Sequence, residues 1–503
     1  MTPTLAMAVM REAAIATFKS EPFYTVQLAL DGFGASSERF KSKADAEVLR
    51  TACENSIAKV TKAERKKKTE KPPALYDLTS QQRDANRVLG FTAQQTLDYT
   101  QILYEKKLVT YPRTDSRYLT DDMAVMLPEL VNMVFSVLPV DGLSDIPINA
   151  KQVINSKKVT DHHAIIPTKE VQKCNFSELP KGELAILQLI ATRLYVSVGD
   201  IHRYAETIIE LDCNGAEFSA KGKTVLQDGW KAFVKKNKST KIDEEEKTLP
   251  SVSVGDELMV IGTEIKEGKT SPPKHFTEDT LLQSMENAGA DEMPEDAERK
   301  GLGTPATRAG IIEKLVRIGF LERKGDKKAK YLIPTHKGTA LVTVMPEQIQ
   351  SASMTADWEE KLMLIERSEY ASDEFMQEII DMISSLVQTY EVVQGAEVLL
   401  PKESTSLGKC PVCGKDVVER PKSFSCSDRE CKFALWKNDR FFSAIGKSMN
   451  STVAKQLLAS GKVKLKGCVS QKTNKKYDAT VWLNVDENGK CQFSMDFEKG
   501  GKK

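Results

Sequence analysis

Strand-like and helix-like stretches alternate along this chain in blocks too long to share one hydrophobic core. Polar and apolar side chains alternate over residues 24–33, amphipathic helical patterns fill much of residues 74–200, and strand-like segments return before residue 270. A chain of 503 residues is also longer than single cores usually grow. The sequence therefore predicts a multidomain α+β protein with roughly three to four domains.

Proline pairs mark where these blocks end. Pro72-Pro73 and Pro272-Pro273 bound the central part of the chain, and Pro401–Gly408 is typical of a linker into a cysteine-containing tail. The predicted helices are Ala44–Val60, Leu78–Lys107 with a break at Gly90, residues 122–138, residues 181–198 and most of residues 277–393. The predicted strands that follow the central helices are Ala205–Leu211, Glu217–Gly222, Thr248–Val252 and Glu257–Glu264.

Charge and cysteine content narrow the class of protein. The 72 Lys and Arg residues nearly balance the 71 Asp and Glu residues, so total charge gives no reason to expect a nucleic-acid partner. Basic runs at residues 62–71, 235–241 and 323–330 are each typical of a solvated loop. No apolar stretch approaches the length of a membrane span, and nine mostly scattered cysteines favour a reducing compartment. We therefore expect a cytoplasmic protein without a membrane partner.

One segment, Leu108–Leu119 (LVTYPRTDSRYL), places a tyrosine beside a permanent cation. Pro112 should end a short strand and leave Tyr111 on a loop. A phenol with a pKa of about 10 is a weak nucleophile unless its oxyanion is stabilised, and Arg113 carries the charge that suits a phosphoryl transition state. Asp115 and the later Asp161-His162-His163 cluster could position these groups or bind a phosphate oxygen. On the residues alone, structural roles for the tyrosine and the histidines stay open.

A second candidate phosphate site lies at Gly301–Pro305 (GLGTP). Thr304 suits the N-cap of a predicted helix and Pro305 suits its first position. A helix start behind a glycine-rich loop presents free backbone N–H groups and the positive end of the helix dipole, which can hold a phosphate. A basic hairpin should follow the helix, in a winged-helix-like arrangement. An ordinary turn is the alternative interpretation of the glycines.

Six segments, in this order and at this rough spacing, resemble those of type IA DNA topoisomerases. The YPRTDS and TPATRA forms are similar to the topoisomerase III branch of bacteria and their mobile elements. The segments are Thr2–Ala6, Gln81–Asn86, Leu108–Leu119, Asp161–Thr168, Pro272–Gly289 and Gly301–Gly310.

The resemblance implies a toroidal body with a small zinc-ribbon-like domain at its C-terminal end. The resemblance implies four parts. A winged-helix-like base starts over 1–24 and continues over 271–400, and a β-rich arch comprises 25–73 and 201–270. A helical domain with the tyrosine spans 74–200, and a topoisomerase-repeat region spans 401–503.

The resemblance also implies the chemistry. Tyr111 would cleave single-stranded DNA, keep the 5′ phosphate as a phosphotyrosine, and rejoin the strand after strand passage without ATP. Arg113 would stabilise the scissile phosphate, and His162 would match the family's active-site histidine. Further DNA contacts are expected at Asp115, Thr304, Thr307 and Arg308.

The sequence departs from the family at its start. Members begin with a TOPRIM domain whose carboxylates bind Mg²⁺, whereas this sequence begins with TPTLA, a motif that normally lies well inside the protein. We therefore expect that the TOPRIM domain is missing, that this chain holds no magnesium ligands, and that it cleaves DNA weakly alone. The expected partners are single-stranded DNA and a TOPRIM domain, with a monomeric state and no small-molecule substrate. The alternative is a non-catalytic single-stranded DNA-binding protein derived from a truncated topoisomerase.

The tail contains four cysteines at the spacing of a structural zinc site, Cys410, Cys413, Cys426 and Cys431. The pattern predicts zinc, with a metal-free relic of the ribbon as the alternative. Aromatic and basic residues interleave at Lys432–Lys437 and Phe441-Phe442, which suits either stacking on single-stranded DNA or the core of a small domain.

Overall fold

The structure is a computed structural model in two units, Met1–Val393 and Gln394–Lys503. It describes residues 1–138, 148–235, 248–288, 301–325, 330–391, 406–470 and 476–497, without 421, 429, 487 and 488. Residues 236–241 and 326–329 of two basic runs, Gly289 of a family-like segment, and residues 401–405 of the linker therefore lie outside the described residues. No described helix has the length and apolar content that a membrane span needs.

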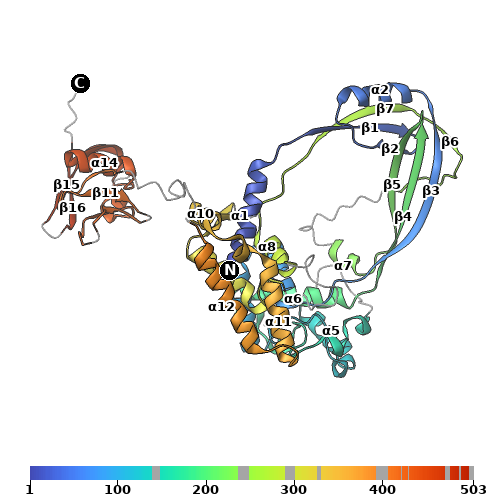
Figure 1. The fold of residues 1–503 in the computed structure, drawn as a ribbon, viewed down its shortest axis with the longest axis horizontal. Helices are drawn as coiled ribbons and strands as arrows, with labels where there is room; N and C mark the ends of the chain where they lie inside the picture. The colour runs from blue at the N-terminus through green and yellow to red at the C-terminus, as the bar shows by residue number, and fades with distance from the viewer. Residues whose placement is uncertain are drawn as a thin grey trace. The chain divides into compact units, whose positions relative to one another are not determined.

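An antiparallel seven-stranded sheet in the first unit joins two distant parts of the chain (Figure 1). Its strand order is β6-β3-β4-β5-β2-β1-β7, so strands from before residue 71 pair with strands from after residue 201. Helix α2 (Lys43–Cys53) packs across β1 and β7. The strands are β1 Pro22–Leu30, β2 Phe33–Ser37, β3 Ile57–Glu70, β4 His202–Cys213, β5 Ala216–Gln227, β6 Glu257–Met259 and β7 Gly262–Lys269.

The lysine-rich run at residues 62–71 is mostly strand, so the prediction of a solvated loop was wrong. Within β3, Lys62 pairs with Glu210 at 3.0 Å and Lys68 pairs with Glu206 at 2.5 Å, both carboxylates lying on the neighbouring strand β4. Such cross-strand ion pairs let a charged sequence form a stable strand. The predicted helix over Ala44–Val60 is likewise too long, because it ends at Cys53 before the chain turns into β3.

The predicted strands after residue 201 are confirmed in part. Ala205–Leu211 and Glu217–Gly222 lie within β4 and β5, and Glu257–Glu264 is divided between β6 and β7. Thr248–Val252 forms no strand. Pro250 lies in the middle of that segment and has no N–H to donate to a neighbouring strand.

The central helical region confirms the predicted helices and the break at Gly90. Gly90 adopts a left-handed φ of +71° at the end of α3, and the side chain of Thr92 caps α4. Leu78, Leu103 and Tyr195 lie in the apolar core that these helices share. The helices are α3 Leu78–Leu89, α4 Ala93–Glu105, α5 Leu127–Val137 and α6 Lys181–Ser197, with the short α7 Lys231–Lys235 after β5.

The first helix of the chain packs against elements more than 300 residues later. Leu5 and Ala8 of α1 (Thr2–Thr17) share a core with Leu315, Leu321 and Val342. The predicted hairpin after residue 320 is confirmed as β8 paired with β9. The later elements of the first unit are α8 Glu278–Glu286, α9 Pro305–Arg317, β8 Leu321–Gly325, β9 Lys330–Pro334, α10 His336–Val344, α11 Ala352–Glu366 and α12 Ser372–Thr389.

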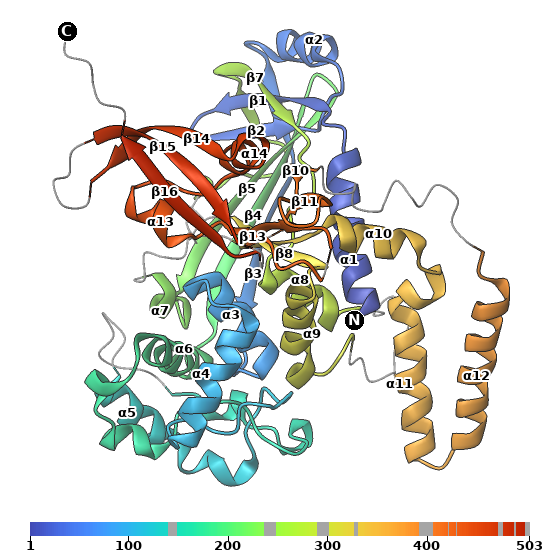
Figure 2. The same cartoon turned by 90° about the vertical axis from the view of Figure 1, so that its left-hand side faces the viewer.

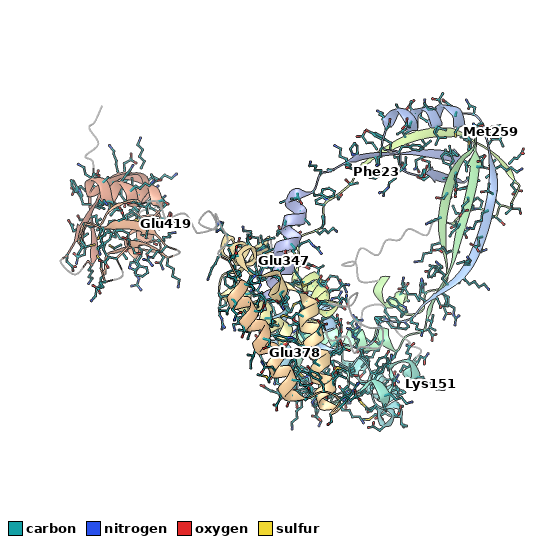
Figure 3. The ribbon with its side chains drawn as sticks, in the orientation of Figure 1. Phe23, Lys151, Met259, Glu347, Glu378 and Glu419 are labelled. Carbon is teal, nitrogen blue, oxygen red and sulfur yellow. The ribbon has the colours of Figure 1, made fainter. Side chains whose placement is uncertain are left out.

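Helices α11 and α12 form a hairpin at the end of the first unit (Figure 2). The rings of Trp358 and Phe375 meet edge to face, with centroids 6.1 Å apart. Glu378, which Figure 3 labels on α12, forms an ion pair with Lys361 and accepts a hydrogen bond from the hydroxyl of Tyr370 at 2.8 Å.

The second unit combines two small sheets and two helices around a core of its own. Phe433 and Phe442 are buried in this core, whereas Trp436 is 53% exposed. The two phenylalanines are thus core residues, and of the aromatic side chains in that segment Trp436 is the one open to solvent. The elements are β10 Gly408–Lys409, β11 Asp416–Glu419, β12 Ser423–Cys426, β13 Ala434–Trp436, α13 Arg440–Ala444, α14 Ser451–Ser460, β14 Lys462–Val469, β15 Lys476–Val485 and β16 Cys491–Phe497.

A buried carboxylate connects α8 to the central helices. Glu278 accepts a hydrogen bond at 2.6 Å from the backbone N–H of Ala93, the first residue of α4, and another at 2.8 Å from Arg323. Burial raises the pKa of Glu278, although Arg323 and the Ala93 N–H act in the opposite direction. The carboxylate is therefore costly to bury and depends on both partners.

Replacing Glu278 by Ala should destabilise the first unit by about 3 kcal/mol, because it leaves a buried N–H and part of a guanidinium without an acceptor. The matched control is Glu313→Ala. Glu313 contacts the same Arg323 at 2.6 Å, but its side chain is 40% exposed, so its loss should cost less than about 1 kcal/mol. Denaturant unfolding followed by circular dichroism measures both values. Equal losses in the two variants would contradict the role given to Glu278.

Candidate active site

A cleft of about 710 Å³ in the first unit collects residues from several distant stretches of the sequence. Its walls come from the Tyr111 loop, the segment around His162, the N-terminal ends of α3 and α9, and the C-terminal end of α8. The lining residues are Asp77, Arg113, Thr114, Asp115, Ser116, Arg117, Tyr118, Lys158, Thr160, Asp161, His162, Glu286, Thr304, Pro305, Ala306 and Arg308.

Backbone and hydroxyl hydrogen bonds hold the two polar loops of the cleft together. The Thr110 N–H donates to the Ile166 carbonyl at 3.0 Å, and the Thr110 hydroxyl donates to the Ala164 carbonyl at 3.0 Å. The Thr114 hydroxyl donates to the carbonyl of His162 at 2.7 Å. The segment before Pro112 makes only an isolated bridge, between Val109 and Pro167, so the short predicted strand is reduced to one pair.

Tyr111 and His162 are neighbours in this arrangement. Their ring centroids are 4.3 Å apart with planes tilted by 46°, and Tyr104 meets Tyr111 edge to face at 5.4 Å. Tyr111 is half-buried, while His162 is exposed and lines the cleft. The phenol is therefore held between two rings, with an imidazole at the side that opens to solvent.

The arginines of the cleft differ in their surroundings. Arg113 is exposed and has no hydrogen bond or ion pair with another described residue. Arg117 donates to Asp77 at 2.7 Å and to Glu286 at 2.8 Å. Burial opposes the charge of Arg117, yet these two carboxylates hold its pKa above the usual value. Arg113 is thus the arginine available to an anionic ligand.

Arg308 is only 3% exposed, although it lines the cleft. It donates to the Thr79 hydroxyl at 2.9 Å and to the Leu302 carbonyl at 3.3 Å, and burial lowers its pKa. Its guanidinium therefore connects α9 to α3, and it is almost fully withdrawn from solvent.

The start of α9 has the predicted form. Gly301 and Gly303 adopt left-handed φ values of +66° and +71°, and Pro305 is the first residue of the helix. The Thr304 N–H donates to the hydroxyl of Thr307 at 2.9 Å. Thr304 lines the cleft, but Thr307 is not among the lining residues and its hydroxyl serves this cap.

Comparison with known proteins identifies the family. A family model described as DNA topoisomerase matches residues 1–377. This chain belongs to the type IA DNA topoisomerase family. It is 37% identical over 455 residues to DNA topoisomerase 3 of Bacillus subtilis (strain 168) and 36% identical over 456 residues to that of Bacillus licheniformis. Each alignment covers 86% of this chain and 61% of the relative, so the chain spans about three fifths of these relatives' length.

A solved structure supports the same fold. Full-length topoisomerase I from Thermotoga maritima is similar to this chain with a TM-score of 0.59 over 83% of this chain and 66% of that one. The sequence identity is 22%, so this likeness concerns the fold alone. The family model and the Bacillus relatives confirm the type IA family that the six segments predicted.

The structure places most of the predicted site residues of this chain around one cleft. Arg113, Asp115, His162, Thr304 and Arg308 line it, and Tyr111 lies against His162. Asp115 accepts a hydrogen bond from the Thr160 hydroxyl at 3.0 Å, so its carboxylate joins the two polar loops.

Several lining residues were not predicted from the sequence, among them the charged or aromatic side chains Asp77, Arg117, Tyr118, Lys158 and Glu286. Arg117 and Tyr118 belong to the same segment as Tyr111, and Lys158 lies three residues before Asp161. The sequence signal for Arg117, Tyr118 and Lys158 was therefore their closeness to the Tyr111 segment and to the Asp161 cluster. Glu286 lies in the family-like segment Pro272–Gly289, which was the available signal for it, whereas Asp77 is recognisable only once α3 and α8 are brought together.

Cys410, Cys413, Cys426 and Cys431 also come together, in the second unit. Their sulfur atoms all lie within 4.8 Å of one another, with Cys413 and Cys426 3.3 Å apart and Cys410 and Cys431 3.7 Å apart. A tetrahedral zinc ion with Zn–S bonds of about 2.3 Å places its sulfurs roughly 3.8 Å apart. This cluster could therefore bind zinc.

The cleft depends on the glycine before α9. A Cβ on Gly301 would lie 2.3 Å from the Met285 carbonyl oxygen, and φ is +66° there, so Gly301→Ala should destabilise the first unit by more than about 1 kcal/mol. The matched control is Gly310→Ala in α9, where a Cβ meets nothing within 4 Å. That change should stabilise the protein by about 0.5–1 kcal/mol. Thermal unfolding measures both shifts, and an unchanged midpoint for Gly301→Ala would show that the turn tolerates a side chain.

Proposed function

We propose that this chain is the tyrosine-bearing body of a type IA DNA topoisomerase that cleaves and rejoins single-stranded DNA. The observation that carries the proposal is the single cleft at which Arg113, His162 and the start of α9 meet, with Tyr111 packed against His162. These groups are a nucleophile, an exposed cation, an imidazole and a helix start, which together suit a phosphodiester. The division into base, arch and helical domain that the resemblance implies is part of this proposal.

In the proposed reaction the Tyr111 phenol attacks a DNA phosphorus atom. A bond forms between the tyrosine oxygen and phosphorus while the bond from phosphorus to the 3′ oxygen breaks. The phenolic proton leaves and the 3′ oxygen takes up a proton. Arg113 offsets the charge of the phosphate, and His162 lies beside the phenol that must lose its proton. Rejoining reverses these steps, so the bond is conserved and ATP is not consumed.

The proposed reaction needs Mg²⁺ from outside this chain. When bound, Mg²⁺ would supply positive charge at the scissile phosphate. Within the described residues, the group of three or more His, Cys, Asp or Glu side chains able to hold a metal is the four-cysteine cluster, which suits zinc. We therefore propose that a TOPRIM domain outside these 503 residues holds the Mg²⁺, and the greater length of the relatives supports this assignment.

Charge favours the second unit as an additional DNA contact. Residues 394–503 contain 21 Lys and Arg against 12 Asp and Glu, a net charge of +9, whereas residues 1–393 contain 51 against 59, a net charge of −8. The near-neutral total hides this difference. Trp436 is 53% exposed and Trp482 is 37% exposed, and exposed tryptophans can stack on unpaired bases. A basic second unit with exposed tryptophans would also suit the alternative function, a non-catalytic single-stranded DNA-binding protein.

Covalent trapping distinguishes the two functions. With Mg²⁺ and a separately purified TOPRIM domain of a topoisomerase 3 relative, an oligonucleotide labelled at its 3′ end should become attached to this chain. Without the domain, the adduct should be weak or absent. Tyr111→Phe should abolish it. Tyr104→Phe is the matched control, since that ring lies 5.4 Å from Tyr111 and only its hydroxyl is lost.

An adduct that persists in Tyr111→Phe would rule out Tyr111 as the nucleophile. Binding of single-stranded DNA with no adduct under any of these conditions would favour the non-catalytic alternative.

We also propose that Cys410, Cys413, Cys426 and Cys431 hold a structural zinc ion. The purified chain should contain about one zinc per molecule by elemental mass spectrometry. Cys426→Ser should lose the zinc and lower the stability of the second unit, because metal binding contributes directly to folding. Cys174→Ser, in the first unit, should keep it. A folded second unit purified without zinc would support the metal-free alternative.

A further inference from the structure

Four cations line the cleft, and the proposed reaction uses only one of them directly. Arg117 is paired with Asp77 and Glu286, and the buried Arg308 donates to Thr79 and Leu302. Arg113 is assigned to the scissile phosphate. The fourth cation, Lys158, is exposed and forms no ion pair with any residue that the structure describes.

Lys158 occupies a defined position in the cleft wall. Its carbonyl accepts a hydrogen bond from the Ser116 hydroxyl at 2.8 Å, and its N–H donates to the Asn155 carbonyl at 3.0 Å. The Ser116 bond ties the backbone of Lys158 to the loop that carries Tyr111, and the Asn155 bond closes the turn in which Lys158 lies. Its position is therefore fixed relative to the nucleophile.

The side chain of Lys158 is also restrained. Its ammonium nitrogen lies 5.1 Å from the ring centroid of Tyr118, within the range of a cation–π contact. An ammonium that is already held over a ring loses less conformational freedom when it binds a ligand than a free lysine does. Lys158 therefore has the properties of a prepared anion contact.

The acidic residues of the cleft limit where a phosphate can bind. Asp77 and Glu286 are paired with Arg117, and Glu286 also with Arg83, whereas Asp115 and Asp161 are exposed on the same two loops as Arg113 and Lys158. A DNA backbone should avoid those two carboxylates and use the exposed cations that form no ion pair with a described residue. Arg113 and Lys158 are these cations, and they come from separate loops of one cleft.

We propose that Lys158, held by Tyr118, is a second DNA-backbone subsite that binds a phosphate next to the scissile one. This inference rests on the proposed function, because it takes single-stranded DNA as the occupant of the cleft. Lys158 acts as a positioning residue that fixes the register of the strand over Tyr111. It reads no base, so its contribution is the same for every sequence.

The salt dependence of binding tests this subsite. Fluorescence anisotropy would give the affinity of the full chain for a labelled oligothymidylate over a range of salt concentrations. Lys158→Met removes one phosphate contact and should reduce the slope of log affinity against log salt by about 0.7. Lys158→Arg keeps the charge and should restore the wild-type slope. Lys157→Met is the matched control, because Lys157 is exposed in the same turn but does not line the cleft.

Arg113→Met separates failure of this inference from failure of the proposed function. If Arg113→Met reduces the slope and Lys158→Met does not, Lys158 is no subsite although DNA occupies the cleft. If neither variant changes the slope, DNA does not occupy the cleft and the proposed function is overturned as well. A slope reduced equally by Lys157→Met would mean general surface charge and would also overturn the subsite. Equal reductions for oligothymidylate and a mixed-sequence strand would support a backbone contact.

Discussion

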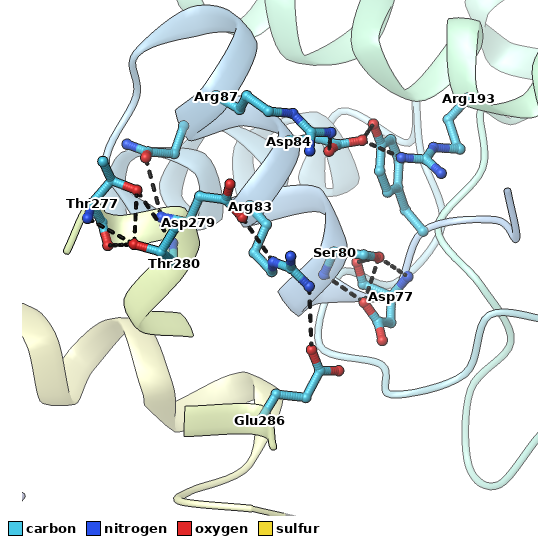
Figure 4. A network of polar contacts seen from close by, with 12 residues as sticks. Asp77, Ser80, Arg83, Asp84, Arg87, Arg193, Thr277, Asp279, Thr280 and Glu286 are labelled. Carbon is cyan, nitrogen blue, oxygen red and sulfur yellow. Dashed lines mark hydrogen bonds and ion pairs between the residues drawn. The ribbon is translucent and has the colours of Figure 1, made fainter. Parts of the chain in front are cut away.

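The candidate active site depends on a set of charged contacts between α3, the Tyr111 loop and α8. Arg83 of α3 contacts Asp279 at 2.8 Å and Glu286 at 3.7 Å, and Figure 4 shows it between these two carboxylates. Arg117 contacts the other oxygen of Glu286, and Asp77 caps α3 through Ser80. Together with the backbone bonds from Leu78 to Thr114 and from Leu302 to Met285, these contacts hold the tyrosine loop and the glycine-rich start of α9 at one cleft. Charged and polar groups are prominent where α3, the Tyr111 loop and α8 meet. Water can solvate such groups, so separating these elements should cost less free energy than separating an apolar interface of the same size.

The same arrangement divides the cations of the site by role. Those with carboxylate partners, Arg83 and Arg117, hold the structure together, whereas Arg113 and Lys158 are left for a ligand. Negative charge develops as a phenol attacks a phosphate, and nearby positive charge must offset it. Arg113 and Lys158 are available for this, because no carboxylate among the described residues already pairs with them. The net charge of −8 over residues 1–393 is consistent with this picture, because a few placed cations replace a broadly basic surface.

Much of the fold was predictable because local signals agreed with it. Gly90 and Thr92 fixed the ends of two helices, and Thr304 with Pro305 fixed the start of α9. The lysine-rich strand β3 was missed because its stability comes from carboxylates on β4, about 140 residues later in the chain. The same contrast between local signals and contacts of distant residues applies to the site. Tyr111, Arg113 and His162 stand in recognisable segments, whereas Asp77, Glu286 and Lys158 gain their roles only from tertiary contacts.

The central claim is that single-stranded DNA enters this cleft with a phosphate beside Tyr111. A crystal structure of the Tyr111→Phe chain with a short single-stranded oligonucleotide tests it most directly. The account predicts a backbone phosphate at the residue 111 ring, within hydrogen-bond reach of Arg113 and next to His162. Oligonucleotide bound only to the second unit, with the cleft of the first unit free of DNA, would contradict it.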